Sequence, residues 1–85
     1  MIEEIRKLLG SEKLLLGTDR TLKALRNGTL KKIYFASNVD KKVKEDVEYY
    51  KELSDFEVVE LKENNVDLGT ICKKPFSISV IGLIK

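Results

Sequence analysis

Two short polar segments contain the residues whose types and spacing suit binding chemistry. The first covers residues 17–23, "GTDRTLK", and follows a run of three leucines. Gly17 would let a ligand approach the backbone closely, and a helix that begins after it would offer unpaired N–H groups. Arg20 and Lys23 are three residues apart, so they share one face of the first helical turn. Because cations are unfavourable at the positive end of a helix, their placement indicates an anionic ligand.

The second polar segment covers residues 73–76 and connects a predicted helix to a predicted strand. It reads Lys73, Lys74, Pro75 and Phe76, and two cations beside an aromatic ring can bind a phosphate and stack on a base. An ordinary structural interpretation stays open, with Phe76 in the core of a strand and the lysines as solubilising residues. If the sheet brings the loop after Leu16 close to the loop before Ser77, the two segments form one surface.

Catalytic and metal-binding patterns are missing from the sequence. There is no histidine, the commonest acid–base residue near neutral pH, and no ligand-spaced cluster of Cys, His or carboxylates. The glycines form neither a P-loop nor a dinucleotide-binding motif. Cys72 lies beside two lysines that could lower its pKa, but without a histidine partner it is interpreted as a small, half-buried filler. We therefore expect no enzyme activity, no cofactor and no metal.

Length and composition predict one small globular domain covering residues 1–85. Hydrophobic residues make up 42% and charged residues 35% of the chain, which is typical of soluble proteins. The apolar runs are far shorter than the roughly 18–20 residues of a membrane helix. The acidic N-terminus "MIEEIRKLLG" lacks the apolar centre of a signal peptide, and one cysteine cannot form an internal disulfide. We therefore expect a cytoplasmic protein without a membrane partner.

The charges are divided unevenly along the chain, although the net charge is only +2. Residues 1–44 contain 11 Lys and Arg against 5 Asp and Glu, whereas residues 45–85 contain 5 against 9. This division suggests a basic surface for an anionic partner and an acidic surface elsewhere. Two solvated helix faces of opposite sign would give the same division, so charge alone leaves both interpretations open.

The elements that must position the two segments alternate between helix and strand. Hydrophobic spacing, capping residues and β-branched runs predict helices and strands at residues 2–9, 13–17, 18–27, 31–37, 41–53, 56–61, 66–72 and 76–84. Thr18, Asp40 and Asn65 are the predicted N-caps, and Val43, Val47, Tyr50 and Leu53 are the predicted inner face of the third helix. Strict alternation predicts an α/β fold, a three-layer α/β/α sandwich around a four-stranded mixed sheet.

Several segments together resemble a known family. They are "LGTDRTLKALRNG" (residues 16–28), "ASN" (36–38), "KEDVEYYKELS" (44–54), "NNVDLGT" (64–70) and "KPFSISVIGLI" (74–84). In this order the chain resembles the archaeal and eukaryotic ribosomal protein L-thirty-e family, part of the L-seven-Ae superfamily of kink-turn RNA binders. The resemblance runs almost without gaps from about residue 14 to residue 84.

The resemblance implies the same α/β/α sandwich and binding to an RNA helix–bulge–helix with sheared G·A pairs, most simply in ribosomal RNA and beside ribosomal proteins. In the superfamily the glycine segment enters the RNA groove at those pairs, and the loop before the last strand covers the extruded bulge nucleotide. Carried over to this sequence, the first contact implies Gly17, Thr18, Asp19, Arg20 and Lys23. The second implies Lys73, Lys74, Pro75 and Phe76, and Asn38 is a weaker further candidate.

Two departures from the family pattern favour a second hypothesis. The superfamily often reads G-x-N-E-x-x-K, and the ribosomal branch commonly has a basic residue where Asp19 stands. Asp19 would repel phosphate, although it could accept hydrogen bonds from base amino groups, and Arg20 could supply the displaced positive charge. The sequence also stops at Lys85, where ribosomal members often continue. The alternative is a free-standing paralogue that acts as a protein-interaction module and has lost RNA binding.

Overall fold

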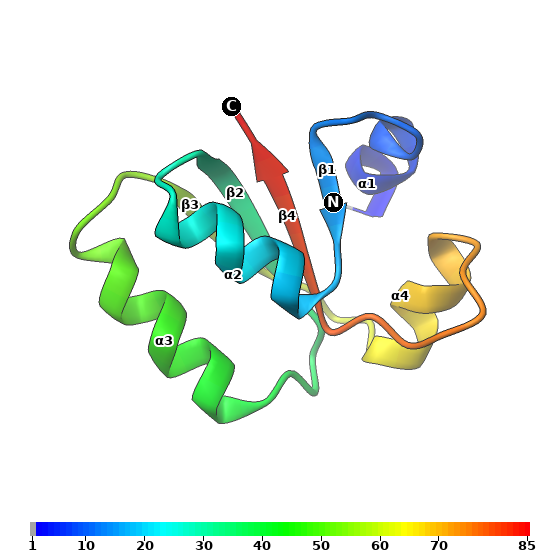
Figure 1. Cartoon of the computed structure of the whole chain (residues 1–85). Helices are drawn as coiled ribbons and strands as arrows, with labels where there is room; N and C mark the ends of the chain where they lie inside the picture. Colours follow the sequence, from blue (N-terminus) through cyan, green and yellow to red (C-terminus); the bar gives the residue numbers. More distant parts are fainter. Residues whose placement is uncertain (1) are drawn as a thin grey trace.

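Helices and strands alternate along the whole chain in the computed structural model, which describes residues 2–85 (Figure 1). The order is the predicted one: α1 (Ile2–Leu8), β1 (Leu14–Leu16), α2 (Thr18–Arg26), β2 (Leu30–Phe35), α3 (Lys41–Lys51), β3 (Glu57–Glu60), α4 (Asn65–Ile71) and β4 (Val80–Ile84).

The four strands form one mixed sheet in the order β1-β4-β2-β3. β4 lies antiparallel to both β1 and β2, and β2 pairs with β3 in parallel. Helices α2 and α3 cover one face, and α1 and α4 cover the other (Figure 1). The predicted three-layer α/β/α sandwich with a four-stranded mixed sheet is confirmed.

The core is divided by the sheet into two halves, because successive side chains of a strand point to opposite faces. In β2, Ile33 and Phe35 pack under α2 and α3, whereas Tyr34 packs under α1 and α4. Ile5 of α1 and Val47 of α3 are fully buried, one on each side. The helical spacing of the inner-face residues therefore predicted the two outer layers correctly.

The beginning of α2 differs from the prediction. Gly17, not Thr18, is the N-cap, and no side chain caps the helix. Gly17 makes the corner with φ of 111°, a conformation that a β-branched residue such as threonine avoids, so Thr18 is already helical. Thr21 is fully buried in the first turn, and its hydroxyl donates a hydrogen bond to the Gly17 carbonyl at 2.8 Å.

A glycine in the central strand β4 brings α2 close to the sheet. A Cβ on Gly82 would lie 2.8 Å from Cγ2 of Thr21 and 3.0 Å from Cδ1 of Leu30. Such distances are shorter than van der Waals contact, so the helix can approach β4 only because position 82 has no side chain. The close approach fixes the first turn of α2 against the strand.

Three further details of the elements were wrong. The N-cap of α4 is Asn64, whose side chain accepts a hydrogen bond from the Asp67 N–H, rather than Asn65. The last strand begins at Val80 rather than residue 76. Leu53 is 67% exposed and lies beyond the end of α3, so it is not an inner-face residue. The Asp40 cap of α3 is confirmed, since its carboxylate accepts from the Lys42 N–H at 2.9 Å.

A buried tyrosine makes the fold less stable at alkaline pH. Tyr34 is fully buried, and its hydroxyl has no hydrogen-bond partner in residues 2–85. Burial, with the carboxylate of Glu4 nearby, raises the pKa of Tyr34 to about 12. The tyrosine of the unfolded chain ionises first as the pH rises, so this contribution to stability is complete below about pH 10 and is lost toward pH 12.

We expect Tyr34→Phe to remove that alkaline loss and to stabilise the protein near pH 7 by about 1 kcal/mol, because the buried hydroxyl has no hydrogen-bond partner among residues 2–85 to offset its desolvation. Urea unfolding followed by circular dichroism between pH 7 and pH 12 measures both effects. The difference in stability between variant and wild type should stay constant below about pH 10 and widen above it. A constant difference at all pH values would contradict the assignment to Tyr34.

Candidate nucleic-acid interface

The glycine corner presents the open N-terminus of α2 to solvent. The Gly17 N–H donates to the Val80 carbonyl at 2.9 Å, which fastens the corner to the start of β4. Since no side chain caps α2, the N–H groups of its first turn remain available to an external acceptor. Asp19, Arg20 and Lys23 are all exposed on this helix. Among the described residues none of the three forms an ion pair.

The second polar segment is held by the end of α4. α4 ends with two hydrogen bonds, from the Lys73 N–H to the Thr70 carbonyl at 3.0 Å and from the Lys74 N–H to the Gly69 carbonyl at 2.9 Å. This is the Schellman arrangement, in which the residue after the C-cap is left-handed and usually glycine. Here that residue is Lys73, with φ of 59°. Lysine therefore occupies a position where the left-handed backbone conformation favours glycine.

We expect Lys73→Gly to stabilise the protein by about 1 kcal/mol, because glycine adopts the left-handed conformation without the penalty of a Cβ. Thermal unfolding of the variant and the wild type provides the measurement. A stabilised variant would show that the left-handed conformation of Lys73 lowers the stability of the fold. An unchanged or lowered melting temperature would contradict this expectation.

The antiparallel pairing of β1 and β4 brings the two polar segments together. The end of β1 and the start of β4 are adjacent, with Leu16 opposite Ile81. A groove of about 760 Å³ runs beside β1 and is lined by Arg20 from the first segment and by Lys74 and Phe76 from the second. The condition under which the two segments form one surface is therefore met. The other predicted residues of the two segments lie outside the groove lining: Gly17, Thr18, Asp19, Lys23, Lys73 and Pro75.

Phe76 is not part of the core. Its side chain is 55% exposed, so the interpretation of this residue as a buried strand residue is wrong. Its backbone, in contrast, lies tightly against α4, where a Cβ on Gly69 would collide with the Phe76 carbonyl oxygen. The ring is therefore carried on a closely packed backbone while more than half of the residue stays exposed.

Asn38 has a partner within the protein that the sequence did not reveal. Its side-chain amide donates to Oδ1 of Asn65 at 2.9 Å, and its own Oδ1 accepts from the Asn65 N–H at 2.9 Å. The carbonyl of Asn65 also accepts from the Ile78 N–H at 2.9 Å. These bonds join the end of β2, the start of α4 and the segment that leads from Phe76 into β4. Asn65 and Gly69 thus position the second segment, and sequence reasoning missed both roles.

Cys72 is the filler that its surroundings predicted. It is 4% exposed at the C-cap of α4 and packs in the core half under α1 and α4. Burial raises the pKa of the Cys72 thiol, and the opposing effect of Lys74 is smaller. The thiol is therefore protonated and inaccessible near neutral pH.

Residues 2–85 contain no cluster of His, Cys, Asp and Glu that could hold a metal ion. Within the same residues, no helix has the length and apolar character required to span a bilayer.

Similar proteins agree with this architecture. The model of the family described as Ribosomal protein L7Ae/L30e/S12e/Gadd45 matches residues 1–85. The large ribosomal subunit protein eL30 of Sulfolobus acidocaldarius is 38% identical over 81 residues, which cover 95% of this chain and 78% of that protein. The eL30 of Methanocaldococcus jannaschii is 36% identical over 77 residues, covering 91% and 70%.

Two solved structures have the same fold at low identity. One is described as a protein with unknown function from Bacillus halodurans C, with a TM-score of 0.83, 20% identity and coverage of 99% of this chain and 83% of that chain. The other is the Giardia lamblia 15.5kD RNA binding protein, with a TM-score of 0.77, 14% identity and coverage of 99% and 70%. Because the family and the curated relatives are ribosomal proteins, the chain is not an enzyme. The whole-length match and the identity to eL30 proteins establish that the chain belongs to the ribosomal protein L7Ae/L30e/S12e/Gadd45 family.

Proposed function

We propose that this protein binds a kink-turn in RNA, as a component of the large ribosomal subunit in the cytoplasm. The observation that carries the proposal is the groove in which Arg20, Lys74 and Phe76 meet from two distant parts of the chain. A cation at an uncapped helix N-terminus beside an exposed aromatic ring suits a phosphate next to an unstacked base. The names of the eL30 relatives and of the Giardia RNA-binding protein support this direction.

Recognition would divide between the two polar segments. Backbone N–H groups of the first turn of α2, from Thr18 onward, together with Arg20 and Lys23, would engage the G·A pairs and the flanking phosphates. Gly17 allows the RNA to approach the backbone at the corner. No step of this process is chemical, since the protein only selects and holds a bent RNA.

The second segment would cover the nucleotide that the bend extrudes. The exposed ring of Phe76 would stack on that base, and Lys73 and Lys74 would bind its phosphates. Pro75 limits the conformations of the loop between them. Asn38 would act mainly through Asn65, although a direct contact with RNA remains part of the proposal.

Asp19 would read a base and would not contact a phosphate. It is exposed on the first turn of α2, beside Arg20. A carboxylate in an RNA groove is repelled by the backbone but can accept hydrogen bonds from base amino groups. We therefore propose that Arg20 provides the charge for phosphates while Asp19 adds selectivity for the sheared pairs.

A filter-binding titration with a kink-turn RNA and a plain duplex of matched length tests the proposal. We expect tight binding of the kink-turn, much weaker binding of the duplex, and affinity that falls as salt rises. Equal weak binding of both RNAs would overturn the proposal.

Asp19 and the low net charge favour one alternative, a free-standing paralogue that binds proteins and has lost RNA binding. The alternative expects that replacing Arg20, Lys23 and Phe76 with alanine leaves RNA binding unchanged, because there would be none to lose. The proposed function expects a large loss with the fold intact.

A further inference from the structure

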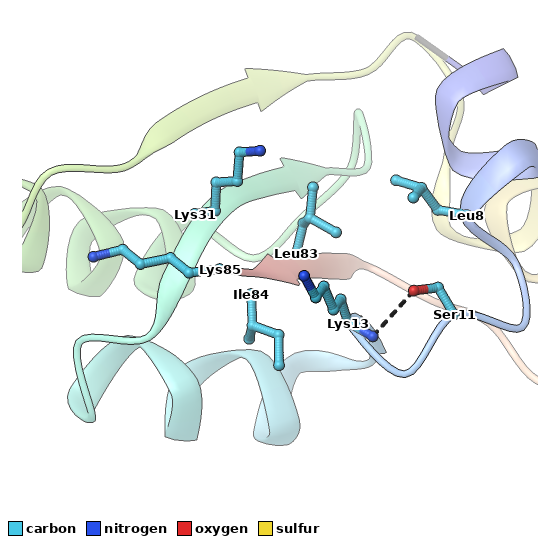
Figure 2. A pocket seen from close by; sticks show the side chains of 7 residues that line it. All are labelled: Leu8, Ser11, Lys13, Lys31, Leu83, Ile84 and Lys85. Carbon is cyan, nitrogen blue, oxygen red and sulfur yellow. Dashed lines mark hydrogen bonds between the residues drawn. The ribbon is translucent and has the colours of Figure 1, made fainter.

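Three lysines gather at the end of the sheet opposite the glycine corner. Lys13 precedes β1, Lys31 lies in β2 and Lys85 follows β4, and these three strands are neighbours in the sheet. Because β4 runs antiparallel to the other two, the three positions lie at the same end. They line a cavity of about 490 Å³, together with Leu8, Ser11, Leu83 and Ile84 (Figure 2). We call Lys13, Lys31 and Lys85 the distal lysine cluster.

Lys31 lies at a bulge in β2 and does not share the carboxylates that pair with Lys32. The pairing of β2 with β4 shifts between Leu30 and Lys32, so Lys31 has no partner residue in β4. Bulges commonly redirect a side chain, and they are frequent beside functional sites. Lys31 is exposed and lines the cavity, whereas Lys32 turns to the carboxylates of Glu4 and Glu57, at 3.2 and 3.1 Å.

The positive charge of the distal lysine cluster is therefore uncompensated. Within residues 2–85, none of its three ammonium groups forms an ion pair, and no acidic residue lines the cavity. The lining also contains no arginine and no aromatic ring that could read or stack on a base. Ammonium groups alone suit phosphates without regard to sequence, as in contacts with a nucleic-acid backbone.

The cavity adjoins the groove of the proposed interface. Ser11 lines both of them, and the edge strand β1 that separates their ends has only three residues, a span of roughly 10 Å. We infer that one stem of the bound RNA continues along the β1 edge and rests its phosphates on the distal lysine cluster. This inference rests on the proposed function and adds a second, sequence-independent contact to it.

The test compares kink-turn RNAs that differ only in stem length. One has minimal stems, and in the others each stem in turn is lengthened by about one helical turn, roughly 10 base pairs. The cluster variant carries Lys13→Gln, Lys31→Gln and Lys85→Gln. A matched control carries Lys41→Gln, Lys51→Gln and Lys62→Gln, which remove the same charge from exposed positions outside both the cavity and the groove.

Lengthening one of the two stems should increase the affinity of the wild type and of the control by about tenfold, and the cluster variant should not gain. On the minimal RNA the two variants should bind equally. With the longer stem, the dependence of affinity on salt should also be shallower in the cluster variant, by about 0.9 in the logarithmic slope for each phosphate that the variant no longer neutralises.

Equal gains for the cluster variant and the control would overturn the inference, because only general electrostatics would then be at work. A wild type that ignores stem length would also overturn it, because no RNA stem would then reach the cavity. Both results would leave the proposed function intact. Failure of the proposed function is distinct, since the wild type would then bind the minimal kink-turn no better than a plain duplex.

Discussion

Phe76→Ala is expected to weaken binding of a kink-turn RNA by about 5- to 150-fold, since stacking of one base on an aromatic ring contributes about 1–3 kcal/mol. The ring is more than half exposed, so its removal should leave the fold and its stability almost unchanged. Binding of a plain duplex should change little, because a duplex has no unstacked base to offer. Filter binding with both RNAs, next to thermal unfolding, separates these effects.

Tyr49→Ala is the matched control for this experiment. Tyr49 is an aromatic residue of similar exposure, 62%, and it lies on α3, whose side chains do not line the groove. Its removal should leave both RNA affinities unchanged. Equal losses for the two variants would mean that Phe76 has no particular role at the bulge, and the proposed stacking contact would have to be abandoned.

Gly69→Ala is expected to destabilise the protein by about 3 kcal/mol, although helix propensity alone would predict that alanine stabilises it. In the interior of an exposed helix, alanine is favoured over glycine by about 1 kcal/mol. At position 69, however, the new Cβ would meet the carbonyl oxygen of Phe76, and a backbone atom cannot turn aside as a flexible side chain can. Either α4 or the loop must move, and overpacking of this kind costs about 1–3 kcal/mol or more.

Urea and thermal unfolding of Gly69→Ala beside Thr70→Ala measure the effect. Thr70 is the next residue of α4 and is exposed, so alanine there should be neutral or slightly stabilising. The melting temperature of Gly69→Ala should fall by more than about 10 °C. Its RNA affinity should fall as well, even where the protein is folded, because the backbone that carries Phe76 would be displaced. A stabilised Gly69→Ala would contradict the close contact.

Local patterns predicted the fold class because they report burial directly. The spacing of Val43, Val47 and Tyr50 marked the inner face of α3, and the β-branched run of β2 marked a central strand. The errors lie where tertiary contacts decide. The side-chain oxygen of Asn65 accepts from the Asn38 amide instead of capping α4, and Asn64 caps the helix.

The candidate site was only partly predictable for the same reason. Residue types indicated two binding segments. The two segments lie side by side only because β4 lies between β1 and β2, and no local sequence pattern reports the order of the strands. The neighbouring lysines Lys31 and Lys32 show the limit most clearly. They are adjacent and of the same type, yet among residues 2–85 Lys31 is exposed and unpaired while Lys32 pairs with two carboxylates that come from distant parts of the chain.

The outer strand β3 affects whether copies of this protein aggregate with one another. An open sheet edge can recruit the same edge of a second copy and so lead to aggregation. The strand has only four residues and carries a carboxylate at each end, Glu57 and Glu60, whose side chains are each 65% exposed. Each carboxylate pairs with a lysine of a neighbouring element, Glu57 with Lys32 at 3.1 Å and Glu60 with Lys44 at 2.7 Å. A strand this short, with charged side chains at both ends, gives a second copy little edge to pair with and so resists self-polymerisation.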